Sequence, residues 1–578
     1  MSIPIASQEE LEEALGALRD ILEDVSFPLE TPLASKGSRA LFEVLRQLDD
    51  YILPRLSRID APLLAVVGGS TGAGKSTLVN SLLGENVAKA TAIRPTTRRP
   101  LLVHLEQDSE WFEGRSILPS LARVQSTAVD DGAHSELALA ESSELPEGIA
   151  LLDSPDIDSV VEDNRRLAAQ LLAAADLWLF VTSAARYADA IPWSMLNEAV
   201  SRDIVVAVVL NRVPSGVGAQ VRADLSRRLS EHGLGHAPLF AISERIDEDG
   251  RIPADDVSPI KTWLAGLAHD GPARASVARQ TLAGAVDALI EQCDPIVEGL
   301  KEQIDIQRAM RGDIARADGV AIGSIIASVE DGRLVRREVL TRWNEAVGAN
   351  RTVRSMIGSV AGLRDRVTGW FKGKGKTGGS GPLPVGEIEK NVESALASSL
   401  TSEAERATRS VEDAWRQRQG ADASRASASQ LVRSGIDRGQ QAVETVRQWR
   451  QTLATIVQEE GREKAASSRA RAVGPKAIEA ALMIVTFASS KGLTGGDGII
   501  GGTAVPSQKL MEAVFGGDAV RKMAKRAREE LLVRARRFVG ADLDPFRDVC
   551  REAETDPGIA VGIQTACDDI ELAREEKG

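Results

Sequence analysis

The sequence predicts an α/β domain followed by an elongated all-α helical bundle, and three observations support this fold class. Short apolar runs alternate with polar, helix-like segments between residues 61 and 271, as in a mostly parallel sheet covered by helices. Beyond residue 272 the strand signal ends and apolar residues recur at helical spacing. Aromatic residues make up only 3% of the 578-residue chain while hydrophobic residues reach 43%, which suits long helices and excludes wholesale disorder.

Composition also limits the class of protein. Lys and Arg number 70 and Asp and Glu number 84, so the net charge of −14 disfavours a dedicated duplex-DNA binder. Three cysteines without a CxxC pair or a Cys/His ligand set argue against zinc and fit a reduced, cytoplasmic compartment. The acidic N-terminus lacks an apolar signal-peptide core, and no run of about 18 apolar residues predicts a transmembrane helix.

Residues 1–60 are expected to form two helices. Ser7 and Glu10 make a capping-box pattern at the start of the first helix. Pro28, Pro32 and Gly37 are expected to interrupt the helical pattern, and a second apolar-periodic stretch follows. Because short isolated helices are marginal in water, we expect both to pack in a neck beside the helix that follows residue 521.

Six apolar runs are expected to form the strands of the α/β domain. Several are continuous runs of Val, Leu and Ile, which are typical of strands buried on both faces of a sheet. The runs cover residues 62–68, 101–105, 149–153, 177–182, 204–211 and 238–242.

The rest of the chain divides by composition. Residues 272–475 are predicted to form a helical stalk with a Gly- and Lys-rich loop near 372–386. Residues 476–515 are apolar and Gly-rich and are predicted to form a tip, and residues 516–578 are predicted to return as helices.

A phosphate-binding loop follows the first predicted strand. The loop matches GxxxxGK[ST] and opens a predicted helix, which is the context that the motif requires. Its backbone N–H groups and the helix N-terminus attract phosphate; the lysine is expected to reach the β- and γ-phosphates, and the serine to bind Mg²⁺. The residues expected at the nucleotide are Gly69, Ser70, Thr71, Gly72, Ala73, Gly74, Lys75, Ser76 and Thr77.

Two further residues are candidates for the metal site. Asp153 ends a buried run, where an aspartate can hold the Mg²⁺ shell; a helix N-cap or turn residue is the alternative. Thr97 lies in a polar loop between the two motifs and can bind Mg²⁺ while orienting the attacking water; an ordinary polar loop is the alternative.

Four segments in order resemble those of dynamin-superfamily GTPases, and the whole resembles bacterial dynamin-like proteins. Residues 97–100 (TRRP) resemble switch I, and residues 153–156 (DSPD) are similar to the D-x-P-G motif of switch II. Residues 211–214 (NRVP) lie where the [NT]-K-x-D base-reading motif belongs, and residues 242–244 (ISE) where the last base-contacting loop belongs. The motif match covers about residues 61–245, which would make this part a P-loop GTPase domain.

The resemblance implies that GTP is hydrolysed by in-line attack of water, through positioning and electrostatic stabilisation. It assigns the catalytic and metal-binding roles to Lys75, Ser76, Thr97 and Asp153. It adds nucleotide contacts from Asp156, Asn211, Arg212 and Ser243. It also implies a homodimer through the GTPase domains or a higher oligomer, leaves room for a paralogous partner, and makes Arg94, Arg98 and Arg99 candidates for compensating charge.

Two positions depart from the family pattern. Asp156 replaces the glycine whose N–H meets the γ-phosphate, and Pro214 replaces the aspartate that accepts the guanine hydrogens. These departures keep two alternatives open. One is a slow or inactive nucleotide-binding scaffold that recruits protein partners through its helices, and the other is a P-loop ATPase.

Two segments are candidates for contact with an anionic membrane surface, which would place the protein at the inner face of the plasma membrane. Trp370 and Phe371 lie beside Lys372 in a basic stretch that suits a bilayer interface; a bundle helix that ends in a flexible loop is the alternative. Ile484 and Phe487 lie in an apolar segment too short to span; a buried helix of the bundle core is the alternative. Nucleic acid is disfavoured, because the basic stretch 521–538 lacks interleaved aromatic residues.

Overall fold

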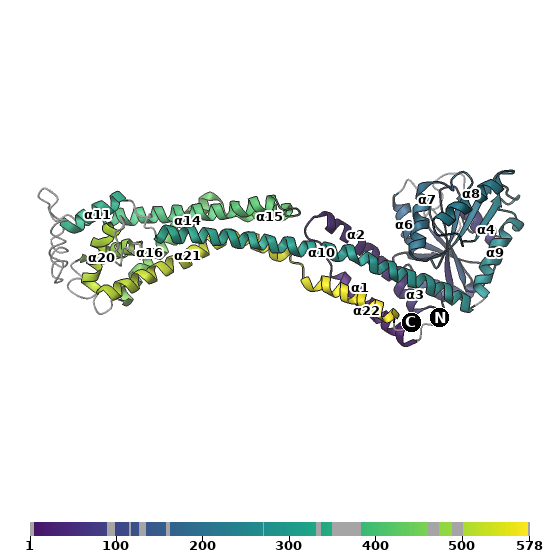
Figure 1. Ribbon diagram of the computed structural model, residues 1–578, viewed down its shortest axis with the longest axis horizontal. Helices are drawn as coiled ribbons and strands as arrows, with labels where there is room; N and C mark the ends of the chain where they lie inside the picture. The colour runs from purple at the N-terminus through teal and green to yellow at the C-terminus, as the bar shows by residue number, and fades with distance from the viewer. Residues whose placement is uncertain are drawn as a thin grey trace. The chain divides into compact units, whose positions relative to one another are not determined.

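A computed structural model describes most of the chain, and its elements are labelled in Figure 1. The described residues are 5–88, 99–114, 117–125, 135–157, 162–269, 271–330, 337–349, 383–460, 473–487 and 501–575. The chain forms two compact units: Met1–Phe27 with Pro32–Glu302 and Thr555–Gly578, and Pro28–Thr31 with Gln303–Glu554. The predicted boundary at residue 272 therefore does not separate the units, because the first unit continues to Glu302.

The first unit contains an eight-stranded sheet with the strand order β3-β4-β2-β5-β1-β6-β7-β8. Neighbouring strands are parallel except β2 and β5, which pair antiparallel with Leu102 opposite Leu152. The strands are β1 (Leu63–Gly69), β2 (Leu101–His104), β3 (Ala122–Gln125), β4 (Glu136–Glu141), β5 (Ile149–Asp153), β6 (Leu177–Ser183), β7 (Val205–Val213) and β8 (Leu239–Ser243). The mostly parallel α/β fold is confirmed, and the six predicted runs correspond to six of these strands; β3 and β4 were not predicted.

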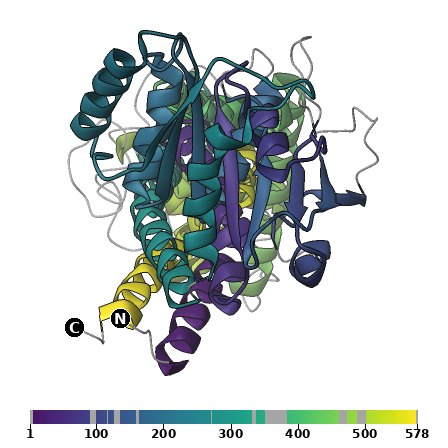
Figure 2. The same cartoon turned by 90° about the vertical axis from the view of Figure 1, so that its right-hand side faces the viewer.

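Helices cover both faces of this sheet (Figure 2), which is why every residue of β1, β5 and β6 is buried. Apolar side chains of α5 (Ser109–Glu113), α6 (Glu162–Ala173), α7 (Ala190–Ser201) and α8 (Gly218–Glu231) share a core with one face. Those of α4 (Lys75–Leu83), α9 (Ala254–His269) and the start of α10 (Gly271–Glu330) share a core with the other face.

The two ends of the chain meet in the first unit, where α1 (Ile5–Glu23) and α22 (Pro557–Glu575) lie side by side (Figures 1 and 2). We call the apolar cluster that they share with α10 the neck cluster; it includes Leu15, Leu289 and Ile563. It also takes side chains from α2 (Pro32–Gln47), the π-helix η1 (Leu48–Ile52) and α3 (Leu53–Ser57).

The predicted interruption at Pro32 and Gly37 is wrong, because both lie within α2. Proline is tolerated at the first position of a helix, since its missing N–H would have no helical partner there. Only residues 24–31 separate the first two helices.

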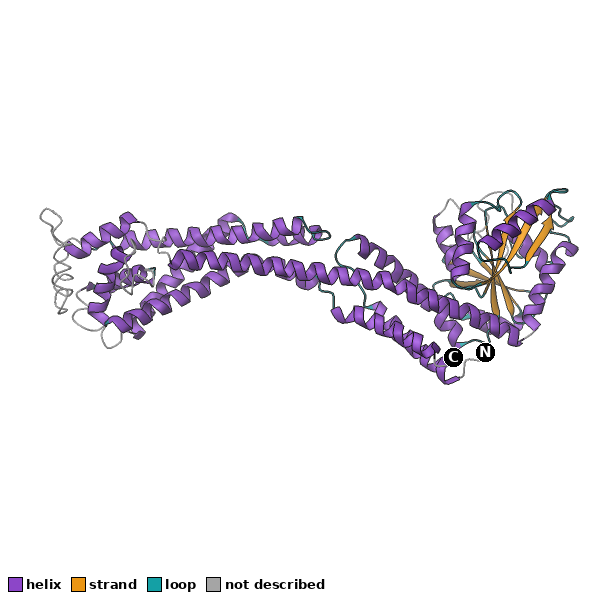
Figure 3. Ribbon diagram, in the orientation of Figure 1, coloured by secondary structure: helices purple, strands orange, loops and turns teal. Residues whose placement is uncertain are grey.

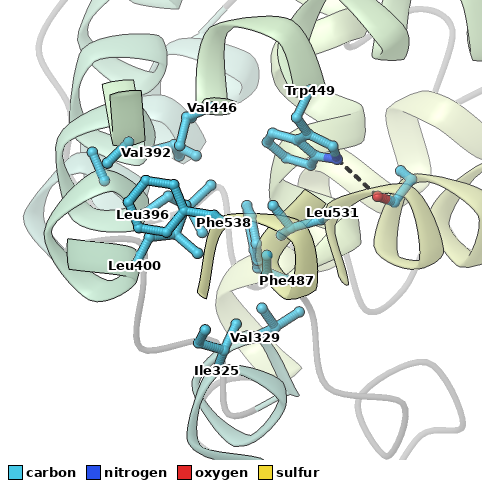
Figure 4. Packing of buried hydrophobic residues seen from close by; sticks show 14 of the residues in the cluster. Ile325, Val329, Val392, Leu396, Leu400, Val446, Trp449, Phe487, Leu531 and Phe538 are labelled. Atoms are coloured by element: carbon cyan, nitrogen blue, oxygen red, sulfur yellow. Dashed lines mark hydrogen bonds between the residues drawn. The ribbon is translucent and has the colours of Figure 1, made fainter. Parts of the chain in front are cut away.

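The second unit is helical in its regular secondary structure wherever it is described (Figure 3). Besides the later part of α10, its helices are α11 (Arg337–Ala349), α14 (Val385–Arg416), α15 (Asp422–Leu431), α16 (Gly435–Glu460), α19 (Pro475–Thr486), α20 (Gly501–Phe515) and α21 (Gly517–Glu552). Their buried faces form one core in which Leu396, Trp449 and Leu531 pack together (Figure 4). Trp449 is fully buried, and its indole Nε1 donates to the carbonyl oxygen of Ala527 at 2.8 Å.

The two apolar residues proposed for membrane contact in this unit lie inside its core. Ile484 and Phe487 are only 3% and 2% exposed, and the Phe487 ring lies 5.7 Å from that of Trp449 (Figure 4). Both residues are therefore buried in the helical core, as the buried-helix alternative describes. Trp370, Phe371 and Lys372 lie outside the described residues. Within the described part of the chain, none of the helices has the length and apolar character needed to cross a bilayer.

Candidate nucleotide-binding site

The loop Gly69–Ser76 joins the end of β1 to the start of α4 and depends on glycine at two positions. Gly69 and Gly74 have φ angles of 150° and 94°. A Cβ atom on Gly69 would lie 2.0 Å from the carbonyl oxygen of Val181, and one on Gly74 would lie 2.5 Å from the Asn211 amide nitrogen. The N-cap residue of α4 is Gly74, which has no side chain to cap the helix. The N-terminus of a helix attracts an anion such as phosphate.

Lys75 is buried at the centre of this loop, with 5% of its surface exposed. Its Nζ donates to the carbonyl oxygens of Gly69 and Ser70 at 3.0 and 3.4 Å. It also forms a short ion pair with the carboxylate of Asp156. Asp156, which replaces the switch II glycine, therefore pairs its negative charge with the lysine that the loop provides for phosphates.

Asp153 and Ser76 form the part of the site that fits a metal ion. Asp153 ends β5 beside Val67 of β1, and the Ser76 hydroxyl donates to its Oδ2 at 2.6 Å. Its Oδ1 is buried and has no hydrogen-bond partner among the described residues. Burial raises the pKa of Asp153 to about 6, although the Ser76 hydrogen bond and the Lys75 charge oppose this shift. A buried carboxylate oxygen without a partner, next to a hydroxyl, is a hard oxygen donor set of the kind that Mg²⁺ prefers.

The structure does not describe every residue predicted at the metal and phosphates. Thr97, Arg94 and Arg98 lie outside the described residues. Arg99 is described, and its Nη1 lies 3.4 Å from Oε2 of Glu136.

Asn211 braces the phosphate-binding loop from the end of β7. Its amide nitrogen donates to the carbonyl oxygen of Ala73 at 2.8 Å, and its amide oxygen accepts from the Arg212 N–H at 2.8 Å. Arg212 has a φ of 53° and lies within β7, where the register of its pairing with β8 shifts between Leu210 and Val213. Both polar groups of Asn211 are therefore used within the protein, one in holding the phosphate-binding loop and one in the backbone of β7.

A cavity of about 1110 Å³ opens beside the phosphate-binding loop, at the carboxyl ends of β6, β7 and β8. Ligands of parallel α/β sheets bind at this edge. The cavity is lined by Thr71, Gly72, Ser183, Ala184, Ala185, Arg186, Tyr187, Arg212, Pro214, Val217, Gln220, Val221, Ala223, Asp224, Arg227 and Glu244. Ser243, the residue predicted at the last base-contacting loop, is not among them, whereas its neighbour Glu244 is.

Tyr187 and Asp224 are residues of this cavity that sequence reasoning missed. The Asp224 carboxylate accepts from Arg227 at 2.6 Å, from Arg228 at 2.9 Å and from the Tyr187 hydroxyl at 3.0 Å. Hydrogen bonds from Arg227, Arg228 and Tyr187 lower the pKa of Asp224 to about 2. The i, i+3 and i+4 spacing of Asp224 with the two arginines was the only signal for this network in the sequence.

Comparisons with known proteins match the part of the chain that contains the phosphate-binding loop. Residues 64–213 match the model of the Dynamin family. A probable transmembrane GTPase, FZO-like, of Arabidopsis thaliana chloroplasts is 27% identical over 135 residues, which are 23% of this chain and 13% of that protein. The match thus spans only a small part of this curated relative.

Two solved structures align with parts or all of the chain. A chain from an oligomerised bacterial dynamin pair, described in terms of long-range sensing and tethering of membranes, aligns with 100% of this chain and 96% of its own length, at 9% identity and a TM-score of 0.44. Era in complex with MgGDPNP and part of 16S ribosomal RNA aligns with 35% of this chain and 56% of its own length, at 21% identity and a TM-score of 0.22.

Proposed function

We propose, from the match of residues 64–213 to the Dynamin family model, that these residues form a GTPase domain and that the protein binds GTP with Mg²⁺ and hydrolyses it. The observation that carries the proposal is the juxtaposition of a glycine-dependent phosphate loop with Lys75 and with the hydrogen-bonded pair Ser76–Asp153. Phosphoryl transfer is catalysed mainly by positioning and charge stabilisation, and these groups provide both.

Each described residue has a defined task in this reaction. The N–H groups at the start of α4 hold the phosphate oxygens, and Lys75 adds positive charge after it leaves Asp156. Ser76 Oγ and Asp153 Oδ1 are the groups that would hold Mg²⁺, which supplies positive charge at the β- and γ-phosphates when bound. Thr97 keeps its proposed role at the metal and the attacking water.

We also propose that GTP binding is coupled to self-association and to contact with an anionic membrane surface. Pairing of GTPase domains, in a homodimer, a higher oligomer or a complex with a paralogue, follows from the family resemblance. The basic, aromatic stretch with Trp370, Phe371 and Lys372 is the remaining candidate for contact at the inner face of the plasma membrane.

The test is a titration and turnover assay with GTP and ATP, each with Mg²⁺, in the presence and absence of anionic liposomes. We expect GTP to bind and to be hydrolysed, and both properties to be lost in Lys75→Ala. We expect liposomes to co-sediment with the protein in the presence of GTP. If the folded protein takes up neither triphosphate, the proposal is wrong.

One observation favours a second candidate function, a slow nucleotide-binding scaffold. The Asp156 carboxylate occupies the partner position of Lys75, so a bound phosphate has to displace it. Tight GTP binding with turnover no faster than that of Lys75→Ala would select the scaffold. Higher affinity for ATP than for GTP would instead select an ATPase.

A further inference from the structure

The base-reading motif of this chain lacks a carboxylate, so guanine has to be recognised by another group or not at all. Guanine presents two adjacent donors, N1–H and the amino group at C2, and a carboxylate accepts both at once because it has only acceptors. Pro214 stands where the family has aspartate, and proline provides neither a carboxylate nor a backbone N–H.

The cavity beside the phosphate loop has two carboxylates in its lining, Asp224 and Glu244. Asp224 is committed, since Arg227, Arg228 and Tyr187 all donate to it. Glu244 is exposed to the cavity, and none of the described residues hydrogen-bonds or ion-pairs with its carboxylate. The adjacent Arg245 does not neutralise it, because that guanidinium is paired with Asp256 at 2.9 and 3.1 Å.

The backbone fixes Glu244 close to the vacant motif position. It directly follows β8, and its N–H donates to the carbonyl oxygen of Val213 at 3.0 Å. Val213 is the last residue of β7 and directly precedes Pro214. A hydrogen bond between the ends of two adjacent strands therefore holds the backbone of Glu244 next to Val213, and Glu244 and Pro214 line the same cavity.

We propose that Glu244 is the specificity-determining residue of this site and accepts the N1–H and C2 amino hydrogens of guanine. The inference rests on the proposed binding of a nucleoside triphosphate and names its base. It gives the chain a carboxylate for guanine selectivity although Pro214 stands in the motif. Adenine has an acceptor at N1 and no amino group at C2, so the same carboxylate disfavours it.

The experiment measures the affinity of the full-length protein for GTP, ITP, ATP and XTP with Mg²⁺, for wild type and for Glu244→Gln. Inosine lacks the C2 amino group, and xanthine carries an oxygen at C2. We expect wild type to prefer GTP over ITP and ATP by at least about tenfold. Glu244→Gln should lose about tenfold in GTP affinity and gain about tenfold for XTP, because an amide accepts from N1–H and donates to the C2 oxygen.

Glu248→Gln is the matched control, because Glu248 is exposed in the same loop but does not line the cavity. It should leave all four affinities unchanged. The gain for XTP separates a change in recognition from a loss of folding, which lowers every affinity.

Three outcomes overturn the inference, and they are distinguishable. Unchanged GTP preference in Glu244→Gln shows that another group reads the base; Gln220, a residue of α8 that lines the cavity, is then tested as Gln220→Ala. Equal wild-type affinity for GTP and ATP shows that no selectivity exists. In both cases the proposed nucleotide binding stands. If wild type binds none of the four triphosphates, the proposed function itself fails and this inference falls with it.

Discussion

Asp156 is the residue whose replacement is expected to strengthen nucleotide binding most directly. Its carboxylate pairs with Lys75 in a buried position and carries negative charge toward the place where phosphate has to bind. Asp156→Asn should raise the affinity for GTP about tenfold, because the ion pair no longer competes with the phosphates. The gain should be larger for GTP than for GDP, and titration calorimetry with both nucleotides measures it.

The control for this change is Asp60→Asn, which removes a carboxylate from an exposed position before β1. It should leave both affinities unchanged. An Asp156→Asn protein with unchanged or weaker GTP affinity would show that Asp156 supports the site and does not inhibit it.

Asp153 gives the binding of Mg²⁺ a pH dependence of known sign. Burial raises its pKa from 3.8 to about 6, so a proton competes with the metal below that pH. Mg²⁺-dependent GTP binding should therefore weaken as the pH falls through about 6. Titrations between about pH 5 and pH 8 measure this, and an affinity for Mg²⁺ that does not change over that range would contradict it.

The raised pKa of Asp153 weakens Mg²⁺ binding at low pH but makes the protein without metal more stable there. The folded state holds the Asp153 proton more tightly than the unfolded state. The contribution of this group to stability is thus fully present below about pH 4 and is lost as the pH rises through about 6. Thermal unfolding in EDTA across this range should show the trend, and Asp153→Asn should remove it.

Much of the site was predictable from sequence because its motif is local. Loop, strand and helix are contiguous, so the spacing of Gly69, Gly74 and Lys75 alone predicts a phosphate-binding loop. The pairing of Lys75 with Asp156 was not predictable, since the two are 81 positions apart and only folding brings them together. The Glu244 carboxylate likewise has no ion-pair partner among the described residues because the neighbouring Arg245 pairs with Asp256, and the sequence does not show this pairing.

At the scale of elements, burial decides which strands could be predicted. The central strands are buried at every residue, and they appear in the sequence as continuous apolar runs. β3 has four residues and no buried side chain, and β4 is buried only at its three middle positions. β3 and β4 lie toward one edge of the sheet. β3 offers no buried apolar residue, and in β4 the apolar run is limited to residues 137–140, between two glutamates.

The joint between α15, α16 and α21 is expected to depend on one buried carboxylate. Asp542 of α21 is fully buried and accepts from Arg433 Nε at 2.6 Å and from Arg438 Nε at 2.7 Å. Asp542→Asn leaves two arginine side chains without their counter-charge and should destabilise the second unit by about 3 kcal/mol. Denaturant unfolding followed by circular dichroism measures the change.

Asp548→Asn in the same helix is the matched control for Asp542. Asp548 pairs with Arg551, and both side chains are at least half exposed. Removing this pair should cost less than about 0.5 kcal/mol. Equal effects of the two substitutions would show that the buried network contributes no more than a surface pair.

At the scale of the whole molecule, the first unit is assembled from distant parts of the chain. Ile563 of α22 is fully buried in the neck cluster with Leu15 of α1 and Leu289 of α10. The sequence indicated that the terminal helices need a partner, because each has an apolar stripe that a lone helix cannot bury. It placed the N-terminal helices beside the helix that follows residue 521, whereas α1 lies beside α22, and residues 555–578 belong to the first unit although more than 250 positions separate them from the rest of it.

This assembly predicts that a substitution near the C-terminus lowers the stability of the nucleotide-binding unit. Ile563→Ala leaves a cavity between three helices and should cost about 3 kcal/mol. Val561→Ala, in the same helix but at a position that is 62% exposed, should cost less than about 0.5 kcal/mol. In calorimetry, GTP with Mg²⁺ should raise the transition of the first unit, because a ligand stabilises the unit that binds it. Ile563→Ala should lower the temperature of that same transition. If it lowers only the temperature of a transition that nucleotide does not affect, α22 does not contribute to the stability of the nucleotide-binding unit.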